Sequence, residues 1–127
     1  MASKLTKIQK LIYEIRGRQV MLDADLADIY QVETRRLNEA VKRNIDRFPP
    51  EFMFQLTQTE YDNLMSQFAT SSGGGRRKLP FAFTEHGVIM LSSVLNSKIA
   101  TQINIAVVKA FIEMRRYIVS VYKLKRN

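Results

Sequence analysis

The chain has 127 residues, 46% of them hydrophobic, and a formal net charge of +8. This length suits one domain, and so basic a domain is either a candidate for nucleic acid, whose counterions Lys and Arg displace, or simply a basic soluble protein. Because the chain has no cysteine, disulfides, thiol chemistry and Cys-ligated zinc are excluded. With neither a signal-peptide pattern nor a membrane-spanning stretch, we expect a cytoplasmic protein.

Residues 1–10 read as a basic N-terminal tail, and residues 11–22 read as a β-hairpin. Two β-rich runs flank the dipeptide Arg16-Gly17, which is typical of a tight turn. Arg16 and Arg18 could touch a phosphate there, although solvated side chains are the simpler interpretation.

Residues 23–42, DADLADIYQVETRRLNEAVK, predict two short helices separated by a tight turn. The spacing of their apolar residues is typical of a helix-turn-helix, in which the two helices lock together; these residues are Leu26, Ala27, Tyr30, Leu37, Ala40 and Val41. Asp23 is expected to cap the first helix, with Asp25 adding negative charge near its N-terminus. Gln31 occupies the turn position that usually carries Gly, because the backbone there tends to need a positive φ.

The second of these helices is predicted from about Thr34 to Arg47, where Pro49-Pro50 would end it. Its outward side chains form a polar set able to reach base edges in the major groove, with Glu39 among them. The candidate base contacts are Thr34, Arg35, Asn38 and Lys42, and the candidate phosphate contacts on this helix are Arg36 and Arg43. A helical hairpin with a solvated basic face is the alternative.

Residues 51–56 alternate Phe52, Phe54 and Leu56 on one face, which predicts a half-buried strand. The sequence from Thr57 to Glu60 is a capping box for a helix over roughly 58–69.

Residues 70–78, TSSGGGRRK, predict a loop, because three consecutive glycines disfavour both helix and strand. A strand over 79–83 follows it. The loop resembles the wing of a DNA-binding domain, and its candidate backbone or minor-groove contacts are Arg76, Arg77 and Lys78. The spacing of a nucleotide-binding P-loop is absent.

Thr84 is expected to cap a helix over 85–95, Asn96 to change the chain direction, and Ser97 to cap the last helix. His86, the only histidine, is expected to be structural, since no nucleophile motif accompanies it.

The last helix is predicted over about 98–124 and carries a heptad stripe, formed by Ile103, Val107, Ala110, Met114, Tyr117, Val121 and Leu124. A second stripe in its first half, Ile105, Val108 and Ile112, predicts burial on two sides there. For the second half we expect self-association through Met114, Tyr117 and Val121. The alternatives are that this face folds back on its own domain, or that the natural protein continues past Asn127.

Together these elements predict an α+β fold: a helix-turn-helix with a small β-sheet, a wing-like basic loop and a long C-terminal helix. The helix-turn-helix core is expected over 11–96. Residues 97–127 would complete that core and provide the dimerisation surface.

The chain resembles the N-terminal DNA-binding domain of phage antirepressors, the KilA-N superfamily. Within it, the resemblance is to the subgroup named for the N-terminal domain of phage open reading frame six. The resemblance covers residues 15–57, 79–97 and 103–111, and its most specific pieces are RLNEAVKRN, RFPPEFMFQL and FTEHG. It implies a small α+β DNA-binding domain found in phages, prophages and bacteria. Larger relatives carry a separate effector domain, so this chain is expected to be a stand-alone regulator or one domain of a longer product.

Three classes of function follow from these expectations. The first is binding of double-stranded DNA by a transcriptional regulator or antirepressor. The second is a protein-interaction module that binds a repressor or another partner through the last helix. An enzyme lacks support, because the carboxylates Asp23, Asp25 and Asp28 have no further ligands at metal-binding spacing. We therefore expect no catalysis, metal or cofactor.

Overall fold

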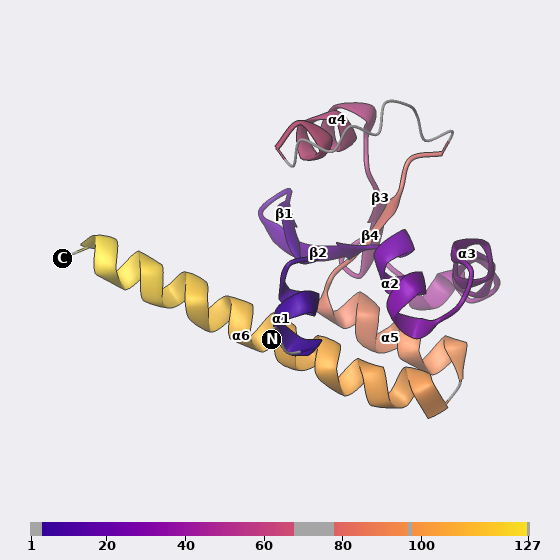
Figure 1. Ribbon diagram of the computed structural model, residues 1–127. Helices are drawn as coiled ribbons and strands as arrows, with labels where there is room; N and C mark the ends of the chain where they lie inside the picture. Colours follow the sequence, from indigo (N-terminus) through magenta and orange to yellow (C-terminus); the bar gives the residue numbers. More distant parts are fainter. Residues whose placement is uncertain (1–3, 68–77, 97, 127) are drawn as a thin grey trace.

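The computed structural model describes residues 4–67, 78–96 and 98–126 (Figure 1). The fold is α+β, as predicted, with four antiparallel strands and a long C-terminal helix. Its elements in chain order are α1 (Lys4–Gln9), β1 (Tyr13–Ile15), β2 (Arg18–Leu22), α2 (Asp23–Tyr30), α3 (Thr34–Arg43), the 3-10 helix η1 (Ile45–Arg47), β3 (Met53–Gln55), α4 (Gln58–Gln67), β4 (Phe81–Phe83), α5 (Glu85–Leu95) and α6 (Lys98–Arg126).

The sheet has the strand order β1-β2-β4-β3. Its central pair, β2 and β4, therefore joins two segments that are distant in the sequence. Met21 pairs with Phe83, which also pairs with Met53, and this row belongs to the main core beneath the helices. The neighbouring row, which contains Leu22 and Ala82, faces a second apolar cluster on the other side. The sheet therefore has apolar side chains on both faces, as expected when both faces are covered.

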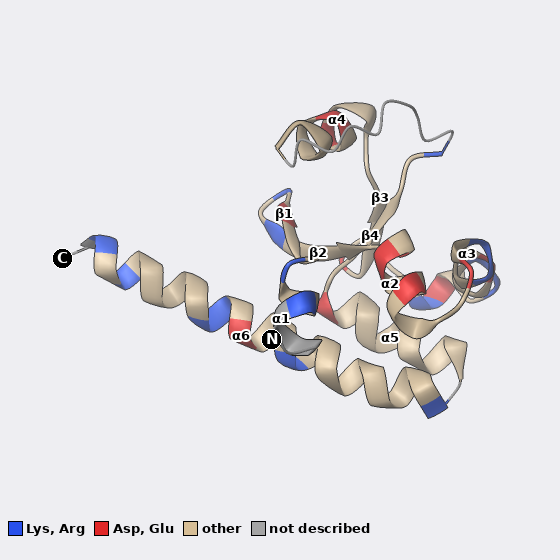
Figure 2. Cartoon of the chain, viewed as in Figure 1, with Lys and Arg blue, Asp and Glu red and all other residues tan. Residues whose placement is uncertain are grey.

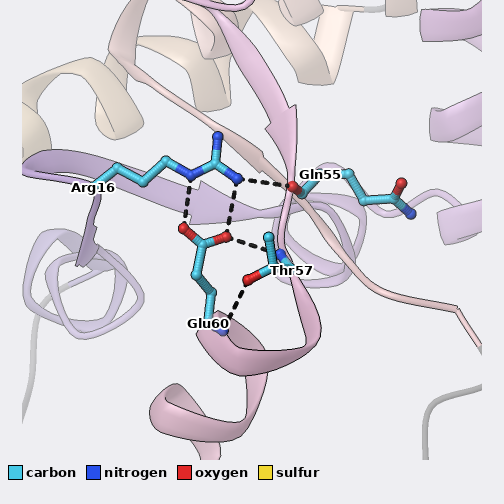
Figure 3. Close-up of polar contacts among 4 residues, drawn as sticks. All are labelled: Arg16, Gln55, Thr57 and Glu60. Carbon is cyan, nitrogen blue, oxygen red and sulfur yellow. Dashed lines mark hydrogen bonds and ion pairs between the residues drawn. The ribbon is translucent and has the colours of Figure 1, made fainter.

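The predicted hairpin between β1 and β2 is confirmed. Arg16 and Gly17 have φ of 57° and 72°, and two consecutive positive φ values favour the right-handed twist of a hairpin. The Arg16 side chain is exposed to solvent, as expected, but it also makes contacts within the protein. Its guanidinium pairs with both carboxylate oxygens of Glu60, at 2.6 and 3.0 Å (Figure 3). It also lies over the Phe54 ring, 4.1 Å from the ring centre.

The capping box that begins α4 is also confirmed. The Thr57 hydroxyl accepts from the backbone N–H of Glu60, and the Glu60 carboxylate accepts from the backbone N–H of Thr57. The same carboxylate thus joins the helix start to the hairpin turn through Arg16, which lowers the pKa of Glu60. Leu64 from this helix is buried in the second apolar cluster. Together these contacts fix α4 to the sheet.

The turn between α2 and α3 adopts the geometry expected where Gly is usual. Gln31 has φ 61° and ψ 42°, in the left-handed region. The backbone N–H of Gln31 donates to the Asp28 carbonyl and that of Val32 to the Ala27 carbonyl, so the last carbonyls of α2 are satisfied. The side chain of Gln31 therefore tolerates a conformation that a Gly would adopt without strain.

The predicted extension of the second helix to Arg47 is wrong. α3 ends at Arg43, and η1 follows after Asn44, whose φ of −123° is not helical. The Asn44 side-chain amide donates to the Ala40 carbonyl at 2.8 Å and so satisfies part of the helix end. The chain therefore leaves the helix several residues before the two prolines.

Residues 4–9, expected within a basic tail, form α1 instead. This helix packs against α6. Ile8 is 3% exposed and Ile12 is 9% exposed, and both belong to the main core. The lysines of this segment are typical of a solvated tail, but packing against α6 buries its isoleucines in the core.

α5 begins and ends as predicted. The Thr84 side chain accepts from the Gly87 N–H at the N-terminus of the helix, and Asn96 ends it in the left-handed region with φ 48°. The Thr84 hydroxyl also donates to the Glu51 carbonyl at 2.9 Å, which holds α5 against the segment before β3. The predicted cap Ser97 lies outside the described residues.

α6 has two different halves. Its first half is buried against α1, α2 and α5 through the heptad stripe, including Ile103 and Val107. The predicted burial of a second stripe is wrong for Ile105, which is 56% exposed, because the other helices cover one side of α6 only. Figure 1 shows the second half extending away from the body, so the alternative that it folds back on its own domain is also wrong.

Candidate nucleic-acid interface

α3 presents a polar, mainly basic outer face. Its inner residues Leu37, Ala40 and Val41 are buried, and the helix packs against α2 and α5. The side chains that remain exposed are Arg35, Arg36, Glu39, Lys42 and Arg43, while Thr34 and Asn38 are half-buried. Figure 2 shows the concentration of Lys and Arg on this helix. The inner face of α3 is therefore packed against the body, and its outer face exposes mainly positively charged side chains.

The four candidate base contacts line one hollow of about 420 Å³. Thr34, Arg35, Asn38 and Lys42 form its wall along α3, together with Asp23, Glu39 and Lys78. Lys78 follows the Gly-rich stretch in sequence and comes from the approach to β4. The fold therefore brings a cation from outside the helix-turn-helix to the outer face of α3.

A second, more apolar hollow of about 290 Å³ adjoins the first and shares Asn38, Lys42 and Lys78 with it. Its remaining wall comes from Val41, Ile45, Met53 and Phe81. Sequence reasoning missed Ile45, which is 55% exposed. The available signal was its spacing of three from Lys42 and seven from Asn38, which continues the outer face beyond the end of α3.

Asn38 has a structural contact in addition to its position on the outer face. Its side-chain amide donates to the Asp23 carboxylate at 3.0 Å, and the other oxygen of that carboxylate accepts from the Ala24 N–H at 2.8 Å. Asp23 is 1% exposed. The prediction that Asp23 caps α2 is wrong, because Leu22 holds the cap position and Asp23 is the first helical residue. Its carboxylate instead links α2 to α3.

The candidate phosphate contacts differ in how the structure places them. Arg36 and Arg43 are exposed on α3, and Arg36 lies 3.8 Å from the Glu33 carboxylate in a solvent-exposed pair. Lys78 is exposed, with its amine 5.8 Å from the centre of the Phe81 ring. Arg76 and Arg77 lie outside the described residues.

The candidate dimer contacts lie along the outer part of α6, away from α3. Met114 is half-buried where the helix leaves the body, Tyr117 is 65% exposed, and Val121 is partly exposed.

A further hollow of about 330 Å³ lies beside the start of α5. His86 lines it with Glu85 and Arg115, which form an ion pair, and with Arg18. The His86 ring also stacks on Phe52, with centres 5.7 Å apart. Within the described ranges, no three His, Asp or Glu side chains gather as a metal-binding group. No described helix combines the length and apolar character needed to cross a membrane.

The match to a protein family covers most of this architecture. The model of the ORF6N domain matches residues 10–94, from the hairpin through the helix-turn-helix into the last turn of α5. No curated protein and no solved structure gives a detectable match to the chain. Since the matched region exceeds half of the sequence and includes every residue of the hollow along α3, the chain belongs to the ORF6N domain family, as the resemblance to phage KilA-N-type domains predicted.

Proposed function

We propose that this protein is a sequence-specific DNA-binding regulator of phage or prophage type, a repressor or an antirepressor, and not an enzyme. The observation that carries the proposal is the hollow along α3, where four polar side chains of one helix face meet Lys78. A helix held from behind by buried Leu37 and Val41 is rigid enough to enter a major groove as a unit.

In this proposal the side chains divide by what they can recognise. Arg35 and Lys42 donate to guanine edges, and Asn38 pairs with adenine. Arg36, Arg43 and Lys78 contact phosphates, together with Arg76 and Arg77. The neighbouring apolar hollow, with exposed Ile45, suits the methyl group of thymine.

The test is binding of purified protein to a randomised pool of duplex DNA, followed by affinity measurements on the enriched sequence across a salt series. We expect Arg35→Ala to cost about 1–3 kcal/mol on the enriched sequence and to reduce discrimination at one base pair. Removing Arg43 should instead weaken all sequences alike and lower the salt slope by about one.

The matched control is Lys109→Ala, which removes one exposed positive charge from α6. If this control weakens binding as much as Arg35→Ala does, only net charge acts and α3 is not the reading element. Unchanged binding by Arg35→Ala and Lys42→Ala together would also contradict the docking of α3.

A second candidate function is favoured by the exposed apolar side chains of outer α6, among them Tyr117 and Leu124. In that case the protein acts by binding a repressor or another protein through this helix. Partner binding that persists at high salt and is lost on changing Val121 would support this function over DNA reading.

A further inference from the structure

The outer part of α6 combines exposed apolar side chains with a position away from the body. Tyr117 is 65% exposed, Ile118 42%, and Leu124 76%. Figure 1 shows that this part extends beyond the other elements, and residues 115–126 would span about 18 Å. Val119 and Tyr122 are exposed as well, so apolar side chains occur on more than one face of this segment. Exposed apolar surface of this kind on a projecting helix is typical of an interaction surface.

The sequence of this segment is poorly suited to forming a helix alone. Residues 117–122 read YIVSVY, and β-branched, aromatic and serine residues are all weaker helix formers than alanine or leucine. The segment continues the anchored first half of α6, so it needs no new helix nucleus, but each added turn of weak helix formers gains little stability in water. Packing against another surface would therefore stabilise the outer part of α6.

One row of apolar residues in the outer part continues the stripe through which the first half of α6 packs against the body. Inside the body, Ile103, Val107 and Ala110 are buried along one stripe of α6. Met114, Tyr117, Val121 and Leu124 extend that stripe with the same alternating spacing of four and three. A strict heptad of this kind favours pairing with another helix.

The charges of the segment indicate which helix can pair with it. With Val107, Met114 and Val121 at heptad position a, the cations Arg115, Arg116 and Lys123 fall at positions b and c, away from the seam, and Lys125 falls at position e beside it. An acidic partner helix would therefore meet only one of these four cations at the edge of the seam. A second copy of the same helix meets an uncharged seam.

We propose that two copies of this protein pair through the outer parts of their α6 helices, running antiparallel. In this alignment Met114 faces the partner's Leu124, and Tyr117 faces the partner's Val121. The basic C-terminal ends are then kept apart, whereas a parallel pair would bring them together. This inference does not depend on DNA binding.

The experiment uses the absence of cysteine from the chain. Tyr117→Cys and Val121→Cys proteins are mixed under mild oxidation, and we expect a disulfide-linked heterodimer as the main product, because these positions face each other across the seam. The control mixture, Arg116→Cys with Lys123→Cys, places both thiols on the outer side and should give little product. Strong linkage within each single seam variant would indicate parallel helices and overturn the antiparallel pair.

Sedimentation over about 1–100 μM protein provides the second readout. We expect a concentration-dependent dimer, and at least a tenfold weaker association for Val121→Asp, with a far-UV spectrum showing that the body of the domain remains folded. A wild-type protein that stays monomeric over this range, or a Val121→Asp variant that dimerises normally, overturns the proposal.

Discussion

The hydrogen bond between Asn38 and Asp23 makes a sharp prediction about the candidate interface. The Asn38→Ala change removes the amide that donates to a carboxylate only 1% exposed. A hydrogen bond to a charged group contributes about 1.5–3 kcal/mol, and the buried carboxylate must also lose that donor. We therefore expect Asn38→Ala to lower the free energy of unfolding by about 2 kcal/mol, independently of any DNA.

The assay is urea unfolding followed by far-UV circular dichroism, with Arg35→Ala measured alongside. Arg35 is exposed on the same helix, so its replacement should change stability by less than about 0.5 kcal/mol. DNA affinity is then compared at a temperature at which both variants are folded. If Asn38→Ala unfolds at the same urea concentration as the wild type, the link from α2 to α3 contributes nothing and the reasoning is refuted.

This comparison also separates two explanations of any lost DNA binding. If the DNA affinity of Asn38→Ala recovers under conditions in which the variant is fully folded, the lost affinity reflects lower stability of the fold around α3. A loss of about 1–3 kcal/mol that remains, and that is confined to one sequence, reflects base reading.

Three further substitutions test the fold around this interface. Gly87→Ala should destabilise the protein by about 1–3 kcal/mol in thermal unfolding, because the new Cβ would lie 2.9 Å from the Phe52 carbonyl carbon and closer still to its oxygen; an unchanged midpoint would show that α5 can shift freely. Gln31→Gly should raise the free energy of unfolding by about 0.5–1 kcal/mol, since it relieves a left-handed backbone, and a decrease would contradict this. Arg16→Ala should cost at most about 1 kcal/mol at neutral pH, because its partly exposed pair with Glu60 is screened by solvent. Arg16 lowers the pKa of Glu60 in the folded state, so this contribution is present above the usual glutamate pKa of 4.5 and is lost as the pH falls through the lowered value; a difference between variant and wild type that persists in strong acid would refute it.

Elements defined by short-range signals were predictable from the sequence. Two positive-φ residues formed the hairpin turn at Arg16-Gly17, Thr57 and Glu60 formed the capping box, and Thr84 began α5. Each depends on residues at most a few positions apart, where backbone sterics and local hydrogen bonds decide the conformation. The polar outer face of α3 was predictable for the same reason, since helical periodicity assigns its inner and outer positions.

Contacts between distant segments were not predictable in this way. The pair of Arg16 and Glu60 joins residues 44 positions apart, and the Asn38 amide reaches a carboxylate 15 positions earlier. Ile105 carries an apolar side chain in a regular stripe, yet it is exposed because no described element covers that side of α6. Burial of a helix face depends on which elements pack against it, and the periodicity of the sequence does not show which elements these are.

The sequence by itself determined the helix-turn-helix, the absence of cysteine chemistry, the basic charge and the register of the α6 stripe, because composition and spacing are properties of the chain. Only the tertiary structure decided that Lys78 joins the hollow along α3, that Asp23 supports this helix from within, and that the stripe of α6 is half covered and half exposed. The physical reason is that proximity in space arises when the sheet pairs β2 with β4 and the helices pack on it, which short-range patterns do not encode.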